Sequence, residues 1–152
     1  MIILRARTIL PVSGPPIADG AIVVSLRRIR AIDRWRNLRS HLSGKASDLG
    51  DVLLLPGLVN AHCHLDYTHM AGLIPPMRSF TNWIRSITAI KSEWSDADFA
   101  ASWLDGAQML LQSGTTTVAD IEAIPSLLPA AWKETPLRVL SFLEMIGVRR
   151  PR

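Results

Sequence analysis

Cysteine is almost absent from this sequence, because Cys63 is the single one among 152 residues. An internal disulfide framework is therefore excluded, and a single thiol is typical of a reducing cytoplasm, where we expect the protein to reside. Long apolar runs are also lacking, since no stretch reaches the roughly eighteen residues that a transmembrane helix needs. The opening run MIILRARTIL is interrupted by Arg5 and Arg7 and precedes no small-residue cleavage pattern, which argues against a signal peptide.

The composition that remains is ordinary for a globular protein, with 48% hydrophobic and 20% charged residues. The net charge of +4 is concentrated in two arginine-rich stretches: Arg27, Arg28, Arg30, Arg34, Arg36 and Arg39, and then Arg149, Arg150 and Arg152. We expect a solvated hairpin and a terminal tail. No aromatic residues interleave to form a stacking platform, so nucleic acid is not a favoured partner, and no membrane partner is expected.

Residues 1–51 predict a small β-rich module. Turn residues in PVSGPP break the first strand, and AIVVSLRRIRAID predicts two strands, 21–25 and 28–32, that meet at a tight connection. These strands are too few to close into a barrel or a complete sandwich.

Residues 52–152 predict strands that alternate with helices. An apolar strand over 52–61 is interrupted by Pro56-Gly57, and helical spacing of apolar residues predicts a helix over 80–94. Ser95 and Asp98 predict the capping box of a second helix, which Gly114 ends. A strand over 114–122, a helix bounded by Pro125 and Pro136, and a strand over 137–145 complete the parallel βα pattern.

The stretch PGLVNAHCHLD, residues 56–66, contains the residues that are most suited to bind a metal ion. In an extended strand side chains alternate, so Asn60, His62, His64 and Asp66 are expected on one face and Cys63 on the other. Two imidazoles one residue apart can reach one metal ion, although the pair alone does not choose between zinc, iron and nickel. A structural histidine pair is the alternative. The place of the pair at a strand end, where active sites of βα barrels lie, favours the metal, and Cys63 is expected to pack.

LLLPGLVNAHCHLD resembles the first barrel strand of the amidohydrolase superfamily, in particular the branch of chlorohydrolases and cytosine, guanine and adenosine-type deaminases. The stretches DGAIVV, HLDYTHMAGL, SGTTTVADI and FLEMIG also resemble segments of that branch, so the likeness covers nearly the whole chain. It implies an α/β fold: about the first three strands of a TIM-like (β/α) barrel in residues 52–152, preceded by an incomplete, β-sandwich-like module in residues 1–51.

The resemblance implies that His62 and His64 are the first two ligands of a divalent metal, with zinc favoured and iron as the alternative. Such a metal makes hydroxide available near neutral pH to attack carbon–nitrogen bonds other than peptide bonds, or carbon–halogen bonds, in a small molecule. Five residues are candidates for the substrate site: Tyr67, His69, Trp83, Asp120 and Glu144. For Tyr67, His69 and Trp83, packing of the loop is the alternative. Asp120 is expected either in the wall of the site or behind the residues that line it, with a solvated strand-end carboxylate or a helix N-cap as the alternative. Glu144, at a strand end, is left open between a role in the site and none.

Members of this branch carry further histidines, an aspartate and the general acid/base on later strands, so we expect the principal acid/base beyond residue 152. We accordingly expect an N-terminal fragment or the product of a truncated or frameshifted reading frame, inactive unless completed, because two histidines do not hold a catalytic metal well. The alternative is a non-catalytic remnant, or an interaction module whose exposed sheet edges contact another copy or a complementing chain.

Overall fold

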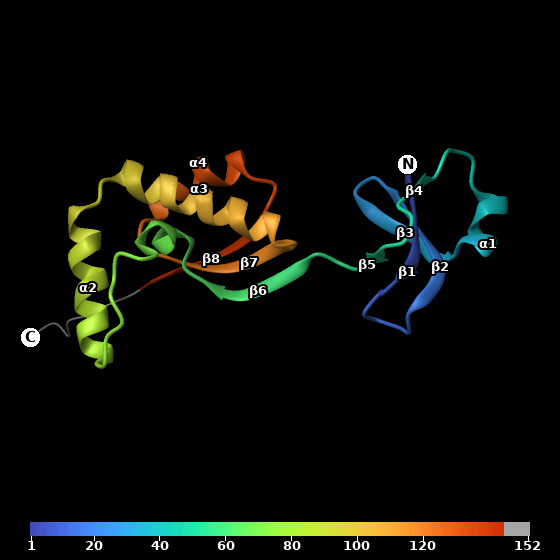
Figure 1. The fold of residues 1–152 in the computed structure, drawn as a ribbon. Helices are drawn as coiled ribbons and strands as arrows, with labels where there is room; N and C mark the ends of the chain where they lie inside the picture. Colours follow the sequence, from blue (N-terminus) through green and yellow to red (C-terminus); the bar gives the residue numbers. More distant parts are fainter. Residues whose placement is uncertain (145–152) are drawn as a thin grey trace, which may run out of the picture. The chain divides into compact units, whose positions relative to one another are not determined.

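The computed structural model describes residues 1–144 and divides the chain into two compact units, Met1–Pro56 and a second that begins at Gly57 (Figure 1). The arginines at 149, 150 and 152 and the end of the FLEMIG stretch lie outside the described residues. A mixed α/β protein is confirmed.

The first unit is built on one sheet of five strands. Its path is β3-β2-β1-β4, formed by β3 (Arg28–Arg34), β2 (Ile17–Ser25), β1 (Ile2–Ile9) and β4 (Ser47–Asp48), and β5 (Leu53–Leu54) also pairs with β1. The predicted hairpin is confirmed, with positive φ angles at Leu26 and Arg27 in its turn. The chain after it forms α1 (Trp35–Leu38) and the 3-10 turn η1 (Arg39–His41).

The second unit contains a three-stranded parallel sheet in the order β6-β7-β8. Its strands are β6 (Leu58–Cys63), β7 (Thr115–Glu122) and β8 (Arg138–Leu143). The segment from β6 to β7 forms η2 (Leu65–Met70), α2 (Phe80–Glu93) and α3 (Asp96–Gln112). The predicted alternation of parallel strands with helices is confirmed.

Local sequence signals account for the ends of α3. The hydroxyl of Ser95 accepts from the backbone N–H of Asp98, whose carboxylate accepts from the backbone N–H of Ser95, so the capping box is confirmed. Beyond the helix, Gly114 adopts a φ of 84°, a left-handed conformation that glycine accepts without a steric cost.

The prediction of one helix between Pro125 and Pro136 is wrong. The chain forms three short turns there: η3 (Pro125–Leu127), α4 (Leu128–Ala131) and η4 (Trp132–Glu134). Pro129 contributes to this division, because it has no backbone N–H to continue a helical hydrogen-bond ladder from η3.

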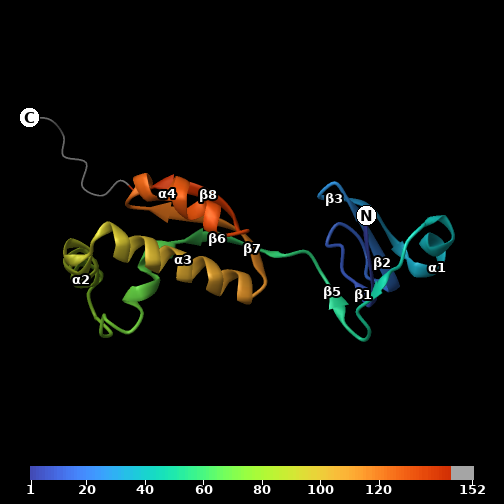
Figure 2. The same ribbon diagram turned by 90° about the horizontal axis from the view of Figure 1, so that it is seen from above.

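The helices α3 and α4 pack on one face of the three-stranded sheet (Figures 1 and 2). The buried core between them consists of Leu65, Trp103, Ala107, Val118, Leu128, Ala131 and Leu137. Cys63 packs against this cluster, which confirms its predicted role. This core holds the ends of β6 and β7, from which the candidate site is built.

Candidate metal and substrate site

The end of β6 departs from regular strand geometry. Asn60 lies opposite Val118 and Cys63 opposite Asp120, so three steps along β6 match two along β7. The side-chain oxygen of Asn60 accepts from the backbone N–H of His62 at 3.2 Å within this bulge. Because a bulge redirects side chains, the strict alternation expected over residues 60–66 is wrong.

Asp66 also departs from the predicted strand. It lies in η2 rather than on a continued strand, and its side chain is buried, with 4% exposed. The close approach of η2 to α3 depends on Gly106, where any side chain would collide with Thr68. Asp66 is therefore beneath the surface that carries the histidines.

The structure brings His62 and His64 together. Their ring centroids lie 5.5 Å apart with the planes at 70°, His62 is exposed, and His64 is half-buried at φ −128° and ψ 85°. Burial and the neighbouring His62 lower the pKa of His64, against the opposing influence of Glu144, and so favour the neutral imidazole that binds metals. Among residues 1–144, no group hydrogen-bonds the buried Nδ1 of His64.

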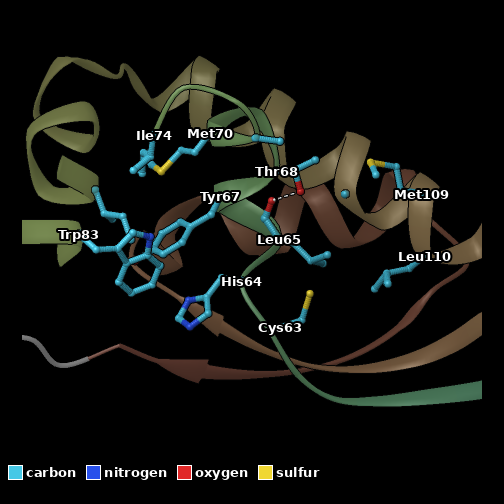
Figure 3. Close-up of a pocket in the computed structure, with 13 residues that line it drawn as sticks. Cys63, His64, Leu65, Tyr67, Thr68, Met70, Ile74, Trp83, Met109 and Leu110 are labelled. Atoms are coloured by element: carbon cyan, nitrogen blue, oxygen red, sulfur yellow. Dashed lines mark hydrogen bonds between the residues drawn. The ribbon is translucent and has the colours of Figure 1, made fainter. Parts of the chain in front are cut away.

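Tyr67 supports the ring of His64. The two rings stack with centroids 4.7 Å apart and planes at 15°, and Figure 3 shows them lying against each other. The Tyr67 hydroxyl donates to Oε2 of Glu144 at 2.8 Å and accepts from Nζ of Lys91 at 2.8 Å. Burial and the contact with Glu144 raise the pKa of Tyr67, so its hydroxyl stays protonated at neutral pH.

Lys91 and Glu144 form an ion pair beside these rings. Nζ of Lys91 lies 3.3 Å from Oε2 of Glu144, and both side chains are largely buried. Lys91 was not predicted as a site residue, although it follows Trp83 and Ile87 at helical spacing on the apolar stripe of α2. A lysine on an apolar helix face is the signal that could have revealed it.

An open pocket of about 730 Å³ lies over these residues. Its wall combines the two histidines with aromatic and charged groups: His62, His64, Tyr67, Phe80, Trp83, Lys91 and Glu144, with Ile84, Ile87, Thr88 and Ala123. A second, more apolar pocket adjoins it and includes Cys63, Met70 and Met109 (Figure 3). Flat aromatic walls next to a few polar groups are typical of small-molecule sites.

The five predicted substrate-site candidates divide into two groups. Tyr67, Trp83 and Glu144 line the pocket with the histidines, although Trp83 does so from α2 rather than from a loop. His69 instead points to α3, where its Nε2 lies 2.7 Å from Oδ2 of Asp105. Asp120 is fully buried, with 0% exposed, so the alternative of a solvated strand-end carboxylate is wrong.

Asp120 belongs to a buried acidic group under the site. Trp103 Nε1 donates to Asp120 Oδ2 at 2.7 Å and to Glu122 Oε1 at 2.9 Å. Burial, with the Asp120 carboxylate beside it, raises the pKa of Glu122 to about 9. Burial likewise raises the pKa of Asp66 to about 7, although the charge of Lys91 opposes the shift. Glu122 is therefore protonated near neutral pH and holds a proton in the interior.

These residues fit a metal ion in part. The two imidazoles are suitable metal ligands, and Nδ1 of His64 has no hydrogen-bond partner among the described residues. However, no group of three or more His, Cys, Asp or Glu side chains in residues 1–144 is placed to hold a metal. The described part of the chain thus offers two imidazoles, whereas a catalytic metal usually needs at least three protein ligands. No helix within that part is long and apolar enough to cross a membrane.

Comparison with known proteins identifies the family. The model of the Amidohydrolase family matches residues 53–141. A 5-methylthioadenosine/S-adenosylhomocysteine deaminase from Symbiobacterium thermophilum is 27% identical over 99% of this chain and 35% of its own length. The chain therefore belongs to the Amidohydrolase family, and it spans about a third of the length of the relatives it matches.

Solved structures support the same fold. Aminofutalosine deaminase from Helicobacter pylori, in complex with methylthio-coformycin, matches with a TM-score of 0.78 and 24% identity over 99% of this chain and 37% of that one. Atrazine chlorohydrolase TrzN from Arthrobacter aurescens, complexed with zinc, matches with a TM-score of 0.80 and 19% identity over 94% of this chain and 35% of that one.

Proposed function

We propose that this chain supplies the first two metal ligands, His62 and His64, of a metal-dependent hydrolase that removes an amine from a carbon atom of a small molecule. The observation that carries the proposal is the histidine pair at the bulged end of β6, with rings 5.5 Å apart beside an open pocket. We further propose residues 52–152 as the first three β/α units of a TIM-like barrel and residues 1–51 as part of a sandwich-like module.

Zinc is the proposed metal, with iron as the alternative, because neutral imidazole suits both and the TrzN neighbour was crystallised with zinc. A divalent metal supplies activation of a water molecule for attack on the substrate carbon. His62 and His64 would hold that metal. The chain's other residues would bind and orient the substrate: Trp83 and Phe80 offer flat apolar faces, and Tyr67, Lys91 and Glu144 offer polar contacts.

The substrate class that best suits this wall is a flat, ring-bearing small molecule with an exocyclic amine. Support comes from the relatives, which are named for deamination of 5-methylthioadenosine and S-adenosylhomocysteine. Carbon–halogen hydrolysis, suggested by the TrzN neighbour, is the second reaction compatible with the same chemistry. We expect catalysis only when the remaining ligands and an acid/base group complete the site, and we propose a cytoplasmic location.

Metal analysis of the purified 152-residue chain tests this proposal. We expect weak binding of zinc at one site per chain, because two imidazoles alone hold a metal poorly, and we expect His62→Ala and His64→Ala each to remove most of that binding. His41→Ala is the matched control, because His41 is an exposed histidine in the first unit and should leave binding unchanged. Zinc binding that survives both single substitutions would refute the assignment of the two histidines.

A non-catalytic, self-associating module is the second candidate function, and it rests on the open face of the three-stranded sheet. Val59, Leu140 and Phe142 are 69%, 62% and 49% exposed there. Among the described residues, β6 and β8 each pair with β7 alone. Sedimentation of the metal-free chain would separate the two candidates, because stable oligomers without bound zinc favour the module.

A further inference from the structure

The backbone that carries His64 leaves the sheet before it reaches the pocket. Strand β6 ends at Cys63, and the dihedral angles of His64 lie outside regular strand geometry. Ladder hydrogen bonds with β7 therefore do not hold the chain at residues 64 and 65. A buried backbone N–H at this point needs another acceptor.

Asp120 provides that acceptor. Its Oδ1 accepts from the backbone N–H of Leu65 at 2.8 Å, and Leu65 directly follows His64. The other oxygen, Oδ2, accepts from Nε1 of Trp103 at 2.7 Å, and the Trp103 side chain is 2% exposed within the core. Asp120 thus connects the packed core to the peptide next to His64 through two short hydrogen bonds.

Direct contact of Asp120 with a ligand is not compatible with this arrangement. The residue is fully buried and lines neither of the two pockets next to the histidines. Both of its oxygens are already used by donors within the protein. Its influence on the site must therefore pass through the position of Leu65 and His64.

We propose that Asp120 is a positioning residue for His64, which fixes the backbone at Leu65 so that the imidazole stays stacked on Tyr67 and close to His62. This inference rests on the proposed role of His64 as a metal ligand. Groups that hydrogen-bond a metal ligand on the side away from the metal hold it in orientation, and their removal commonly lowers metal affinity. Asp120 differs from such groups because it acts on the peptide after the ligand rather than on the imidazole itself.

Nuclear magnetic resonance of the metal-free chain provides the first test. In Asp120→Ala we expect hydrogen exchange at the Leu65 amide to accelerate more than exchange at core amides such as Ala107. We also expect the ring signals of His64 to lose the shift that stacking on Tyr67 produces. Asp120→Asn retains one oxygen, which can accept from Leu65, but its amide nitrogen cannot accept from Trp103, so it should restore both signals in part. Glu122→Gln, which does not contact Leu65, should leave them unchanged.

Zinc affinity provides the second test. We expect Asp120→Ala to weaken zinc binding by about tenfold or more, and Asp120→Asn, which keeps one of the two acceptors, to recover part of the loss. If Asp120→Ala does not fold, Trp103→Phe serves in its place, since it removes the donor to Oδ2 while keeping an aromatic ring in the core, and a smaller change in the same signals is expected. A folded Asp120→Ala or Trp103→Phe variant with unchanged Leu65 exchange and His64 signals overturns the inference.

The two tests separate this inference from the proposed function. A wild-type chain that binds no zinc contradicts the proposed function for the isolated chain. The metal-free signals of Leu65 and His64 still decide whether Asp120 positions the histidine.

Discussion

The two faces of the sheet β6-β7-β8 differ sharply in their surroundings. On the face that α3 and α4 cover, Val118 and Asp120 are fully buried and Trp103 is 2% exposed. On the opposite face Leu140 and Phe142 remain 62% and 49% exposed. Val139, which directly precedes Leu140 in β8, points to the covered face and packs on the core. Strand β8 is apolar on both faces, which is typical of a parallel strand that is covered on both sides.

The difference indicates where the interior polar groups are stabilised. Asp120 and Glu122 lie on the face that α3 and α4 cover. Burial there strengthens the hydrogen bonds that both carboxyl groups accept from Trp103, and a carboxyl group without such a partner would destabilise the fold. The pocket that contains the two histidines lies instead at the ends of the strands. The buried hydrogen bonds thus lie on the covered face of the sheet, whereas the pocket opens at the ends of its strands.

Among substitutions that test this difference between the two faces, Trp103→Ala is expected to lower the free energy of unfolding most. Removal of a buried indole leaves a cavity and takes the shared donor from two buried carboxyl groups, so we expect a loss of about 3–5 kcal/mol in the free energy of unfolding. Urea denaturation followed by circular dichroism measures it. Phe142→Ala on the open face is the matched control, with an expected loss of about 1 kcal/mol. Equal losses for the two variants would mean that the faces do not differ in packing.

Glu122→Gln is expected to change how stability depends on pH. Folding raises the pKa of Glu122 from its ordinary value of 4.5 to about 9, so between these values the folded state keeps a proton that the unfolded state loses. The free energy of unfolding then falls as pH rises through this range, by up to about 1.4 kcal/mol per pH unit. Glutamine resembles the protonated carboxyl group and should remove this dependence.

Urea denaturation between about pH 7 and pH 8 isolates Glu122, because the contribution of Asp66, with a pKa of about 7, is largely complete there. Ionisation of the Cys63 thiol, whose pKa burial also raises, contributes only at higher pH. The variant should be more stable than the wild type at the upper end of this range. At pH 4, where both forms are neutral at this position, the two proteins should be similar. An identical slope in the two proteins would contradict the raised pKa.

Local signals in the sequence predicted features of the structure that depend on neighbouring residues. The capping box at Ser95, the glycine at position 114 and the histidine pair at the strand end each involve residues within four positions of one another. Such features follow from short-range backbone and hydrogen-bond geometry, which does not depend on the rest of the fold.

Features that depend on contacts between distant segments were not predicted. The bulge between Asn60 and Cys63 arises from pairing with β7, so the alternation rule placed Asp66 on the wrong surface. The pairing of Lys91 with Glu144 joins residues 53 positions apart. The burial of Asp120 likewise requires α3 to cover β7, and the sequence near Asp120 does not reveal this.

Leu140→Lys is expected to have the smallest effect on folding and to test the open face most directly. Because Leu140 is 62% exposed, we expect the free energy of unfolding to change by about 0.5 kcal/mol or less. A charge in the centre of an exposed apolar surface should reduce any self-association, which analytical ultracentrifugation at several concentrations would detect. Val139→Lys is the contrasting variant, since Val139 packs against the core and its replacement should destabilise the fold strongly. If Leu140→Lys destabilised the chain as much as Val139→Lys, then Leu140 would be covered in solution, and the two faces would be equivalent.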